Sequence, residues 1–360
     1  MLKFIHCADV HLDAPMETNL SAAQAEQRRG ELLETFLELI AYARQAGVRA
    51  VLIAGDLFDG ARVSATTQDV VFSAMENAPD VDFLLLPGNH DSVTLARLAG
   101  SMPPNVVLFG SQWESVRYGD VVVSGCEMLQ SNCTSLYAGL NLDPELTNIV
   151  MLHGQLGTRA GMDLVDASQL RGRGIDYLAL GHIHAYGQQK LDARGVACYS
   201  GCLEGRGFDE CGPKGFVELT CENGMVNTEF VPFARRQLHT VTVGITNVEN
   251  VTTMLDLALK VAASQEIPSD SLVKFELQGG YSPDANKDLT YLESSLNREF
   301  FFAKVVDKTR LLVDANDFAY DQSLRGAFVR AVMASGESEG EKQRIIQCGL
   351  RALRGEEVAL

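Results

Sequence analysis

The chain has 360 residues, more than one hydrophobic core usually serves, so we expect at least two domains. Its composition, 46% apolar and 21% charged, is typical of a globular protein and excludes a disordered chain. The formal net charge of -17 excludes a protein that coats DNA through bulk electrostatics, although a bound metal or a basic partner would still allow a nucleic-acid substrate.

From residue 1 to about 235, short apolar runs alternate with helical stretches, which is the pattern of a layered α/β domain. The runs predict strands at residues 2–5, 51–53, 83–86, 121–123, 149–152 and 177–180. Helical spacing of apolar residues predicts helices at 21–46 and 66–77. Residues 195–232 are expected to form β-structure with glycine-rich turns.

A second α/β pattern follows, so we divide the chain into domains at residues 1–235, 236–315 and 316–360. The middle part predicts strands at 240–243, 273–277, 301–306 and 311–313, and helices at 251–261 and 287–297. The last part is a helical tail whose two stretches are separated by the polar run 336–341. Its apolar stripes would either dock on a partner or pack on the tail's own domain.

Neither a membrane span nor an export signal is expected. No apolar run approaches the roughly 18 residues that a span requires, and polar residues between positions 6 and 11 interrupt the first apolar stretch. Four cysteines lie near one another, but without the C-x-x-C spacing of structural zinc sites: Cys198, Cys202, Cys211 and Cys221. We interpret them as buried or reduced thiols and expect a cytoplasmic protein.

Five predicted strands are each followed at once by residues that can bind a metal. In chain order these residues are Asp9 and His11, Asp56 and Asp59, Asn89 and His90, His153, and His182 and His184. One Asp or Asn after a strand is usually only a turn residue, and a lone histidine is more often a satisfied polar group. Since ligands in layered α/β proteins bind outside the carboxyl ends of strands, five such coincidences predict one shared site.

The residue types favour a two-metal site. Imidazole and carboxylate together suit manganese, iron or zinc better than calcium or magnesium. Seven ligand groups are too many for one tetrahedral ion and fit two ions, roughly 3.5–4 Å apart, that clamp the attacking and leaving oxygens of a phosphoryl displacement. We therefore predict two divalent ions, manganese first, with iron, zinc or magnesium as alternatives. The ions would outweigh the charges of Asp9 and Asp56 and attract a phosphodiester to an acidic protein.

Five short motifs carry these residues, and together they resemble the motif series of the calcineurin-like metallophosphoesterases. They are Asp9-x-His11, Gly55-Asp56-x-x-Asp59, Gly88-Asn89-His90-Asp91, His153-Gly154 and Gly181-His182-x-His184. Within that superfamily the chain is similar to the SbcD-type DNA repair exonucleases, the bacterial nuclease subunit of a double-strand-break repair complex. Three further runs carry that likeness: Phe4 to Asp13, Tyr199-Ser200-Gly201, and Phe208-Asp209-Glu210 before Lys214-Gly215-Phe216.

The resemblance implies a layered sandwich of two mixed sheets flanked by helices, with a smaller α/β capping domain and a helical tail. It also implies two ligand sets, Asp9, His11, Asp56 and His184 for one ion, and Asp56, Asn89, His153 and His182 for the other. His90 would stabilise the phosphate and protonate the leaving oxygen, and Asp59 would pair with His90 and raise its pKa.

The sequence departs from the family in two places. Asp59 stands where archaeal and eukaryotic relatives often have histidine, which is the bacterial pattern. Gly201-Cys202-Leu203 replaces the usual Gly-Ser-Pro, so substrate contacts in this loop are not carried over. Arg206 would either contact a phosphate or be a solvated loop charge. Asp91, like Asp13, is expected to be a turn or helix-cap residue.

We predict a hydrolase that cleaves DNA as an exonuclease, with endonuclease activity also compatible, in DNA repair and recombination. The resemblance implies a homodimer that works with an SbcC-type, SMC-like ATPase. One alternative is a metallophosphatase or phosphodiesterase acting on nucleotides or phosphoproteins, because function does not follow from fold. Another is a non-catalytic scaffold with the same fold, which the complete set of ligands disfavours.

Overall fold

The computed structural model describes residues 1–16, 20–60, 63–159, 161–282, 285–312, 318–353 and 355. They form two compact units, Met1–Gln237 and Leu238–Leu360. The stretch predicted as a separate tail falls within the second unit. Every residue predicted to bind metal or substrate lies in the first unit.

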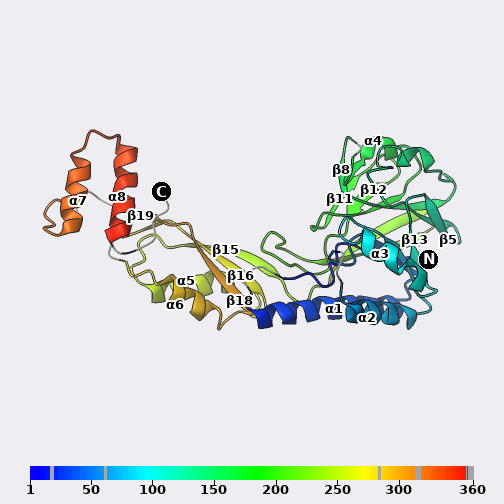
Figure 1. Ribbon diagram of the computed structural model, residues 1–360, viewed down its shortest axis with the longest axis horizontal. Coiled ribbons are helices and arrows are strands. Elements are labelled where there is room, and N and C mark those ends of the chain that lie inside the picture. Colours follow the sequence, from blue (N-terminus) through cyan, green and yellow to red (C-terminus); the bar gives the residue numbers. More distant parts are fainter. Residues whose placement is uncertain are drawn as a thin grey trace. The chain divides into compact units, whose positions relative to one another are not determined.

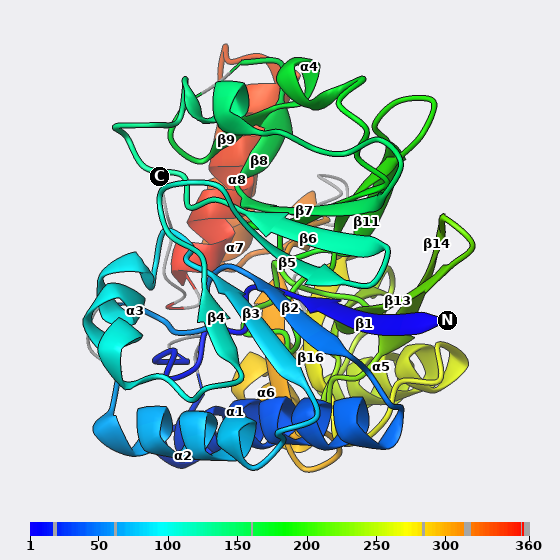
Figure 2. The same ribbon diagram turned by 90° about the vertical axis from the view of Figure 1, so that its right-hand side faces the viewer.

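The first unit is built on two six-stranded mixed sheets (Figures 1 and 2). The first sheet has the order β14 (Met225–Pro232), β13 (Gly215–Glu222), β1 (Leu2–Cys7), β2 (Ala50–Ala54), β3 (Asp82–Leu86) and β4 (Val106–Leu108). Strands β1 to β4 are parallel, whereas β13 runs antiparallel to both β1 and β14. The ends of the first three strands therefore meet at one edge of this sheet.

The second sheet has the order β11 (Gly187–Lys190), β12 (Val196–Tyr199), β10 (Tyr177–Gly181), β7 (Thr147–His153), β6 (Val121–Gly125) and β5 (Glu114–Tyr118). Its four inner strands are parallel and its two edge strands antiparallel. The register pairs Gly181 with His153, so the ends of β7 and β10 lie side by side.

The inner strands have continuous apolar sequences because apolar layers cover both faces of the sheet. On β1, Phe4 belongs to the layer between the two sheets, together with Leu52 and Ile149. The neighbouring Ile5 belongs to the layer beneath, where Leu32 and Phe36 are buried with it. Figure 2 shows α1 (Ala22–Gln45) and α2 (Ala65–Glu76) on that side of the first sheet, with the second sheet on the other.

Shorter elements connect these layers. They are the helices α3 (Ser92–Leu98) and α4 (Ala167–Leu170), the 3-10 turns η1 (Ala99–Ser101) and η2 (Leu136–Gly139), and the strand pair β8 (Gln155–Gly157) and β9 (Leu164–Asp166). Sequence periodicity did not predict these segments, because each is short or partly polar.

A buried ion pair ties α1 to the loop that precedes Arg206. The Arg28 guanidinium donates to the Glu204 carboxylate at 3.0 Å and to the carbonyl of Gly205 at 3.0 Å. Thr35 donates its hydroxyl hydrogen to Glu204 at 2.8 Å. Since Arg28 and Glu204 are both fully buried and hydrogen-bonded, they fix where this loop lies on the helix.

The second unit contains a three-stranded parallel sheet of β15 (Leu238–Gly244), β16 (Leu272–Gln278) and β18 (Phe302–Asp307). Helices α5 (Val251–Ser264) and α6 (Leu289–Leu296) accompany it, with the short strands β17 (Gly280–Tyr281) and β19 (Arg310–Leu311). The predicted strand at 311–313 is thus only partly observed, and Val313 lies outside the described residues.

The tail forms α7 (Leu324–Met333) and α8 (Glu339–Leu353). The break between the two helices covers residues 334–338, so α8 begins inside the polar run 336–341 that was predicted to separate them. Val329, Val332, Ile346 and Leu350 are buried in the same hydrophobic cluster as Val241 of β15. Much of the apolar stripe therefore packs within its own unit. In the ranges that the structure describes, no helix combines the length and the apolar character that crossing a bilayer would take.

Candidate metal centre

Five strand ends deliver the predicted metal ligands to one place. His153 is the last residue of β7, and the other ligands stand in the loops directly after β1, β2, β3 and β10. The loops are held together by backbone hydrogen bonds, since the N–H of Asp9 donates to the carbonyl of Gly55 at 3.1 Å and that of His11 to the carbonyl of Asp56 at 2.9 Å. Thus backbone hydrogen bonds fix the ligand loops after β1 and β2 to each other.

The backbone at several ligand positions is in a conformation that side-chain-bearing residues rarely adopt. The φ angles are 51° at Asp9, 50° at His11, 53° at Asp56 and 92° at His182. Such positive φ values cost free energy and persist where the surrounding structure imposes them. Their concentration at the strand ends marks this edge of the fold as a functional site.

Glycine is required beside Asp56, the residue predicted to bridge the two ions. A Cβ atom on Gly88 would lie 2.1 Å from Oδ1 of Asp56, far inside van der Waals contact. A Cβ on Gly55 would lie 2.0 Å from Nδ1 of His153, and this glycine has a φ of +99°. The two glycines therefore allow the ligand loops to approach more closely than any larger residue would.

One cluster of the site contains Asp9, His11 and His184, each with a ligand atom within 4.8 Å of the others. The His11 and His184 rings meet edge to face, with their centroids 5.1 Å apart. Both oxygens of Asp9 accept hydrogen bonds from the backbone N–H of His182, at 2.9 and 3.0 Å. The carboxylate of Asp9 is thus held in place from the loop after β10.

The second cluster gathers around His153. Its Nε2 lies 3.0 Å from Oδ1 of Asn89 and 3.3 Å from Oδ2 of Asp56. The Nδ1 atom of His182 lies 3.3 Å from the same amide oxygen of Asn89. Asp56 is also 3.7 Å from Nε2 of His11, so its carboxylate stands between the two clusters.

The histidine pKa values depend on these surroundings. Burial lowers the pKa of His11, and burial followed by the charge of His153 lowers that of His182. For His153, burial would lower the pKa, but the hydrogen bond and charge of Asp56 outweigh it and raise the pKa to about 9. The same contact outweighs burial at Asp56 and holds its carboxyl pKa below the usual range.

Asp59 lies between two histidines rather than beside one. Its Oδ1 atom is 3.2 Å from Nδ1 of His90, as expected, and 3.0 Å from Nδ1 of His11. The hydrogen bond from His11 is the main cause that lowers the pKa of the Asp59 carboxyl. His90 itself is about half exposed, with 45% of its side chain accessible, and its backbone N–H donates to Asp56. Asp59 therefore connects a predicted metal ligand to the predicted proton donor.

Arg206 lies beside this group and is not a solvated loop charge. Only 20% of its side chain is exposed. One guanidinium nitrogen is 3.8 Å from Asp59, and the other donates to Glu210 at 3.1 Å. The alternative that left Arg206 in solvent is therefore wrong, and its charge lies next to the two histidines that contact Asp59.

Comparison with known proteins decides the family. The family model described as calcineurin-like phosphoesterase matches residues 2–186, which include every candidate ligand up to His184. The chain belongs to the calcineurin-like phosphoesterase family. The match ends within the first unit, so the second unit lies outside it.

Curated relatives of this phosphoesterase are distant. The uncharacterized metallophosphoesterase YhaO of Bacillus subtilis is 28% identical over 274 residues, which cover 71% of this chain and 66% of the relative. The DNA double-strand break repair protein Mre11 of Methanopyrus kandleri is 26% identical over 270 residues, covering 64% of this chain and 56% of the relative. The match thus spans less than two thirds of either relative.

Among solved structures, a dimetal phosphatase from Danio rerio is similar over 62% of this chain and 93% of its own, with 14% identity and a TM-score of 0.42.

The phosphoesterase family binds two divalent metals, and the residues present fit such a pair. Nε2 of His11 is buried with no hydrogen-bond partner among the described residues. Nδ1 of His153 lies 2.9 Å from the carbonyl of Ala54, which accepts its hydrogen, so Nε2 is left to face the oxygens of Asn89 and Asp56. A nitrogen lone pair facing two oxygen acceptors needs a proton or a cation between them. The donor set is therefore suited to cations.

Two residues near the centre were not predicted from the sequence to have a role in the site. Glu210 accepts a hydrogen bond from Nδ1 of His184 at 2.6 Å, and Lys214 donates from Nζ to the carbonyl of His184 at 2.6 Å. Burial would raise the pKa of Glu210, but the hydrogen bond from His184 and the charge of Arg206 lower it to about 2. Both residues belong to runs that carried the family resemblance, which was the available signal.

The carboxylate of Asp91 forms its hydrogen bonds with the turn and a neighbouring loop and not with the helix that follows. Its oxygens accept from the backbone N–H of Gly88 at 2.9 Å and of Phe58 at 3.2 Å, while it makes no side-chain cap at α3. The prediction that Asp91 is a turn or helix-cap residue is confirmed through its turn contacts. Burial, with the charge of Asp56, raises the pKa of Asp91 to about 7.

The thiols of the cysteine group do not approach this centre as ligands. Cys198, Cys202 and Cys221 are buried, and Cys211 is exposed. Burial raises the pKa of Cys198 to about 11 and that of Cys221 to about 12, which favours the protonated thiol over the metal-binding thiolate. The interpretation as buried or reduced thiols is confirmed, since all four cysteines are free and three of them are buried.

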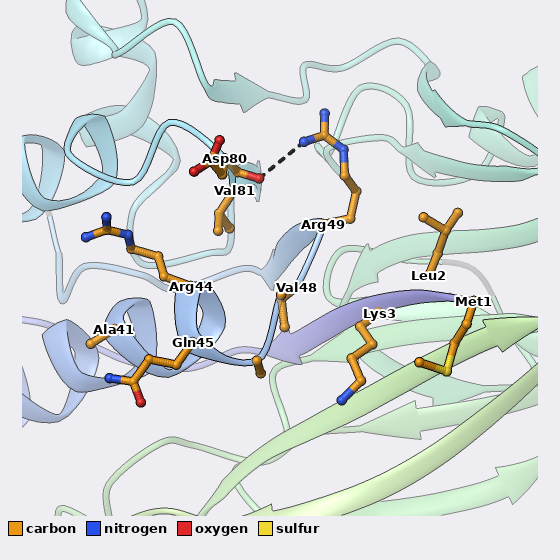
Figure 3. Close-up of a pocket in the computed structure, with 12 residues that line it drawn as sticks. Met1, Leu2, Lys3, Ala41, Arg44, Gln45, Val48, Arg49, Asp80 and Val81 are labelled. Carbon is orange, nitrogen blue, oxygen red and sulfur yellow. Dashed lines mark hydrogen bonds between the residues drawn. The ribbon is translucent and has the colours of Figure 1, made fainter.

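A cavity of about 670 Å³ lies elsewhere in the same unit, at the start of β1 and the end of α1 (Figure 3). Its lining includes Lys3, Arg44 and Arg49, and Arg49 donates to the carbonyl of Asp80. None of the predicted site residues lines it. Since β1 enters the sheet here and delivers its ligands at its other end, this cavity is remote from the metal centre.

Proposed function

We propose that this phosphoesterase is a metal-dependent DNA nuclease that hydrolyses phosphodiester bonds. The observation that carries the proposal is the meeting of a full ligand set with His90, Asp59 and Arg206 at one edge of the sandwich. Mre11 of Methanopyrus kandleri, a DNA double-strand break repair protein by name, adds support from a distant relative. Since the match covers only part of that relative, the activity remains our proposal.

Two ligand sets follow from the two clusters. Asp9, His11, Asp56 and His184 would hold one divalent ion, and Asp56, Asn89, His153 and His182 the other, manganese being the first choice. When bound, such ions neutralise phosphate charge and lower the pKa of a water molecule that attacks phosphorus. Burial lowers the pKa of His11 and of His182, which favours the neutral rings that metal ligands require, whereas His153, with its pKa raised to about 9, would have to release its proton when an ion binds.

The chain's own residues would handle the substrate. His90 is half exposed and its Nδ1 lies against Asp59, so Nε2 is the ring nitrogen left to contact a phosphate oxygen. From there it would stabilise charge and give a proton to the leaving oxygen, a role that typically contributes about 10²–10⁴-fold in rate. Arg206 would hold a phosphate oxygen, because its guanidinium lies beside Asp59 and keeps some exposure.

We further propose that the protein acts in double-strand-break repair, in the cytoplasm, as a homodimer with an SbcC-type ATPase. The similarity of the first 235 residues to SbcD-type nucleases supports this. The second unit would limit which DNA ends reach the metals. Two lysines of this unit lie against one carboxylate, Lys308 at 2.6 Å and Lys274 at 3.5 Å from Glu276, so their charges are already paired.

Titrating manganese into the protein with linear DNA, a cyclic nucleotide and a phosphopeptide would test the substrate class. Cleavage of DNA in preference to the other two is the expected result. A matched pair of variants tests the chemistry. His90→Ala should lose cleavage, whereas His239→Ala, on β15 of the second unit, should keep it. Faster hydrolysis of the cyclic nucleotide or the phosphopeptide would refute the nuclease proposal.

A further inference from the structure

Glu210 is a buried carboxylate that touches two different parts of the metal centre. Its side chain is 7% exposed. Oε1 accepts from Nδ1 of His184 at 2.6 Å and from the Arg206 guanidinium at 3.1 Å. Oε2 accepts from the backbone N–H of Arg206 at 2.7 Å. A single side chain therefore joins a candidate metal ligand to a candidate phosphate ligand.

The first contact sets which nitrogen of His184 is available. Both a carboxylate oxygen of Glu210, at 2.6 Å, and a guanidinium nitrogen of Arg206, at 3.2 Å, lie against Nδ1. Since the carboxylate is an acceptor only and lies closer, Nδ1 carries the hydrogen and Nε2 keeps its lone pair. Lys214 holds the carbonyl of the same residue, so both the ring and the backbone of His184 are fixed. This arrangement presents Nε2 to the cluster that contains Asp9 and His11. Histidine ligands commonly gain orientation and basicity from such a partner.

The second contact fixes Arg206. Glu210 binds both the backbone and the guanidinium of this residue, which together leave the side chain few other directions. From this position the guanidinium reaches Asp59 at 3.8 Å, and Asp59 lies against His90. Releasing Arg206 would therefore remove a positive charge from beside the proton donor.

The two predicted ion sites differ in what holds their histidine ligands in place. His153, in the other cluster, lies with its Nδ1 against the backbone carbonyl of Ala54, which no side-chain substitution removes. Among the residues that the structure describes, Glu210 contacts the cluster with Asp9, His11 and His184, through His184, and not the ligands around His153. Loss of Glu210 should consequently weaken one ion and spare the other.

We propose that Glu210 is a positioning residue that orients His184 toward one of the two metal ions and holds Arg206 beside Asp59. The proposal rests on the two-metal centre of the proposed function but not on DNA as the substrate. It therefore predicts metal and phosphate binding, which are measurable without any turnover.

Isothermal titration with manganese alone tests the first half. The wild type should bind two ions, and Glu210→Ala should weaken one of them by about 10–100-fold while the other is unchanged. In a His184→Ala background, Glu210→Ala should cause no further loss. Glu218→Ala is the matched control, because Glu218, on β13, is a carboxylate with low exposure that likewise accepts from two side-chain donors, Lys3 and Tyr42.

Glu210→Gln separates the two contacts. Its amide oxygen still accepts from His184, so manganese affinity should stay within about threefold of wild type. Its NH₂ group then faces the N–H of Arg206, and two donors cannot pair. Titration of inorganic phosphate into the manganese-loaded variant should show about tenfold weaker binding, the size expected for a lost charged hydrogen bond.

Three results would overturn the proposal. They are two undisturbed ions in Glu210→Ala, equal weakening of both ions with an unchanged melting temperature, and unchanged phosphate binding in Glu210→Gln. If Glu210→Ala fails to fold, the Glu210→Gln phosphate measurement still decides the Arg206 contact. If the wild type binds two ions but does not cleave DNA, the nuclease proposal is refuted, whereas the proposed role of Glu210 is not affected.

Discussion

Substituting Asp59 by Asn should damage metal binding as well as catalysis, and the structure shows why. Oδ1 of Asp59 lies 3.0 Å from His11 and 3.2 Å from His90. An Asn oxygen can still accept one hydrogen bond, but it brings no charge to a fully buried imidazole. Loss of the carboxylate partner of a ligating histidine typically reduces metal affinity by about 10–100-fold, or about 1.4–2.7 kcal/mol.

The effect on cleavage should be larger, because Asp59→Asn also leaves His90 without its carboxylate. General acid catalysis supplies about 10²–10⁴-fold, so saturating manganese should restore only part of the lost rate. The assay is manganese titration followed by DNA cleavage at saturating metal. Asp82→Asn is the control, since Asp82 accepts from Arg49 and Tyr118 at the start of β3. Unchanged manganese affinity in Asp59→Asn would refute the shared role of this carboxylate.

Three further predictions concern other parts of the first unit. His90→Ala should reduce cleavage by about 10²–10⁴-fold and leave manganese affinity within about threefold, because His90 belongs to neither predicted ligand set; titration and turnover check this. Gly88→Ala should abolish binding of at least one ion by displacing Asp56, since its Cβ would lie 2.1 Å from Oδ1. The free energy of unfolding should fall as the pH drops below 4.5. Burial would raise the pKa of the Glu31 carboxyl, but hydrogen bonds, chiefly from Arg236, outweigh burial and lower this pKa to about 2. The depressed pKa contributes about 3 kcal/mol that is present above pH 4.5 and lost as the pH falls toward 2; urea unfolding of wild type and Glu31→Gln measures it.

One outcome would contradict each of these three predictions. Manganese loss in His90→Ala would make that ring a metal ligand. Two full-affinity ions in Gly88→Ala would show that the turn relaxes without moving Asp56. Identical pH dependence in wild type and Glu31→Gln would remove Glu31 from the acid response.

The sequence by itself determined where the ligands lie along the fold. Each candidate ligand follows an apolar run, and parallel strands end at a common edge, so the sequence order of His11, Asp56 and Asn89 was enough to predict one site. A layered α/β domain was predictable from the apolar runs, because strands buried on both faces leave strong runs, whereas the two-sheet sandwich was expected from the family resemblance. The short or partly polar elements β5, β8, β9 and β11 left no such signal.

Only the tertiary structure decided which side chains share a hydrogen bond. Asp59 was predicted to serve His90 alone, but the loop after β1 also brings His11 to the same oxygen. The contact of Glu210 with His184 joins residues 26 positions apart, and Arg206 joins them from the same loop. Local sequence fixes a residue's strand end or turn, whereas partner choice depends on how separate loops fold against one another within a few ångströms.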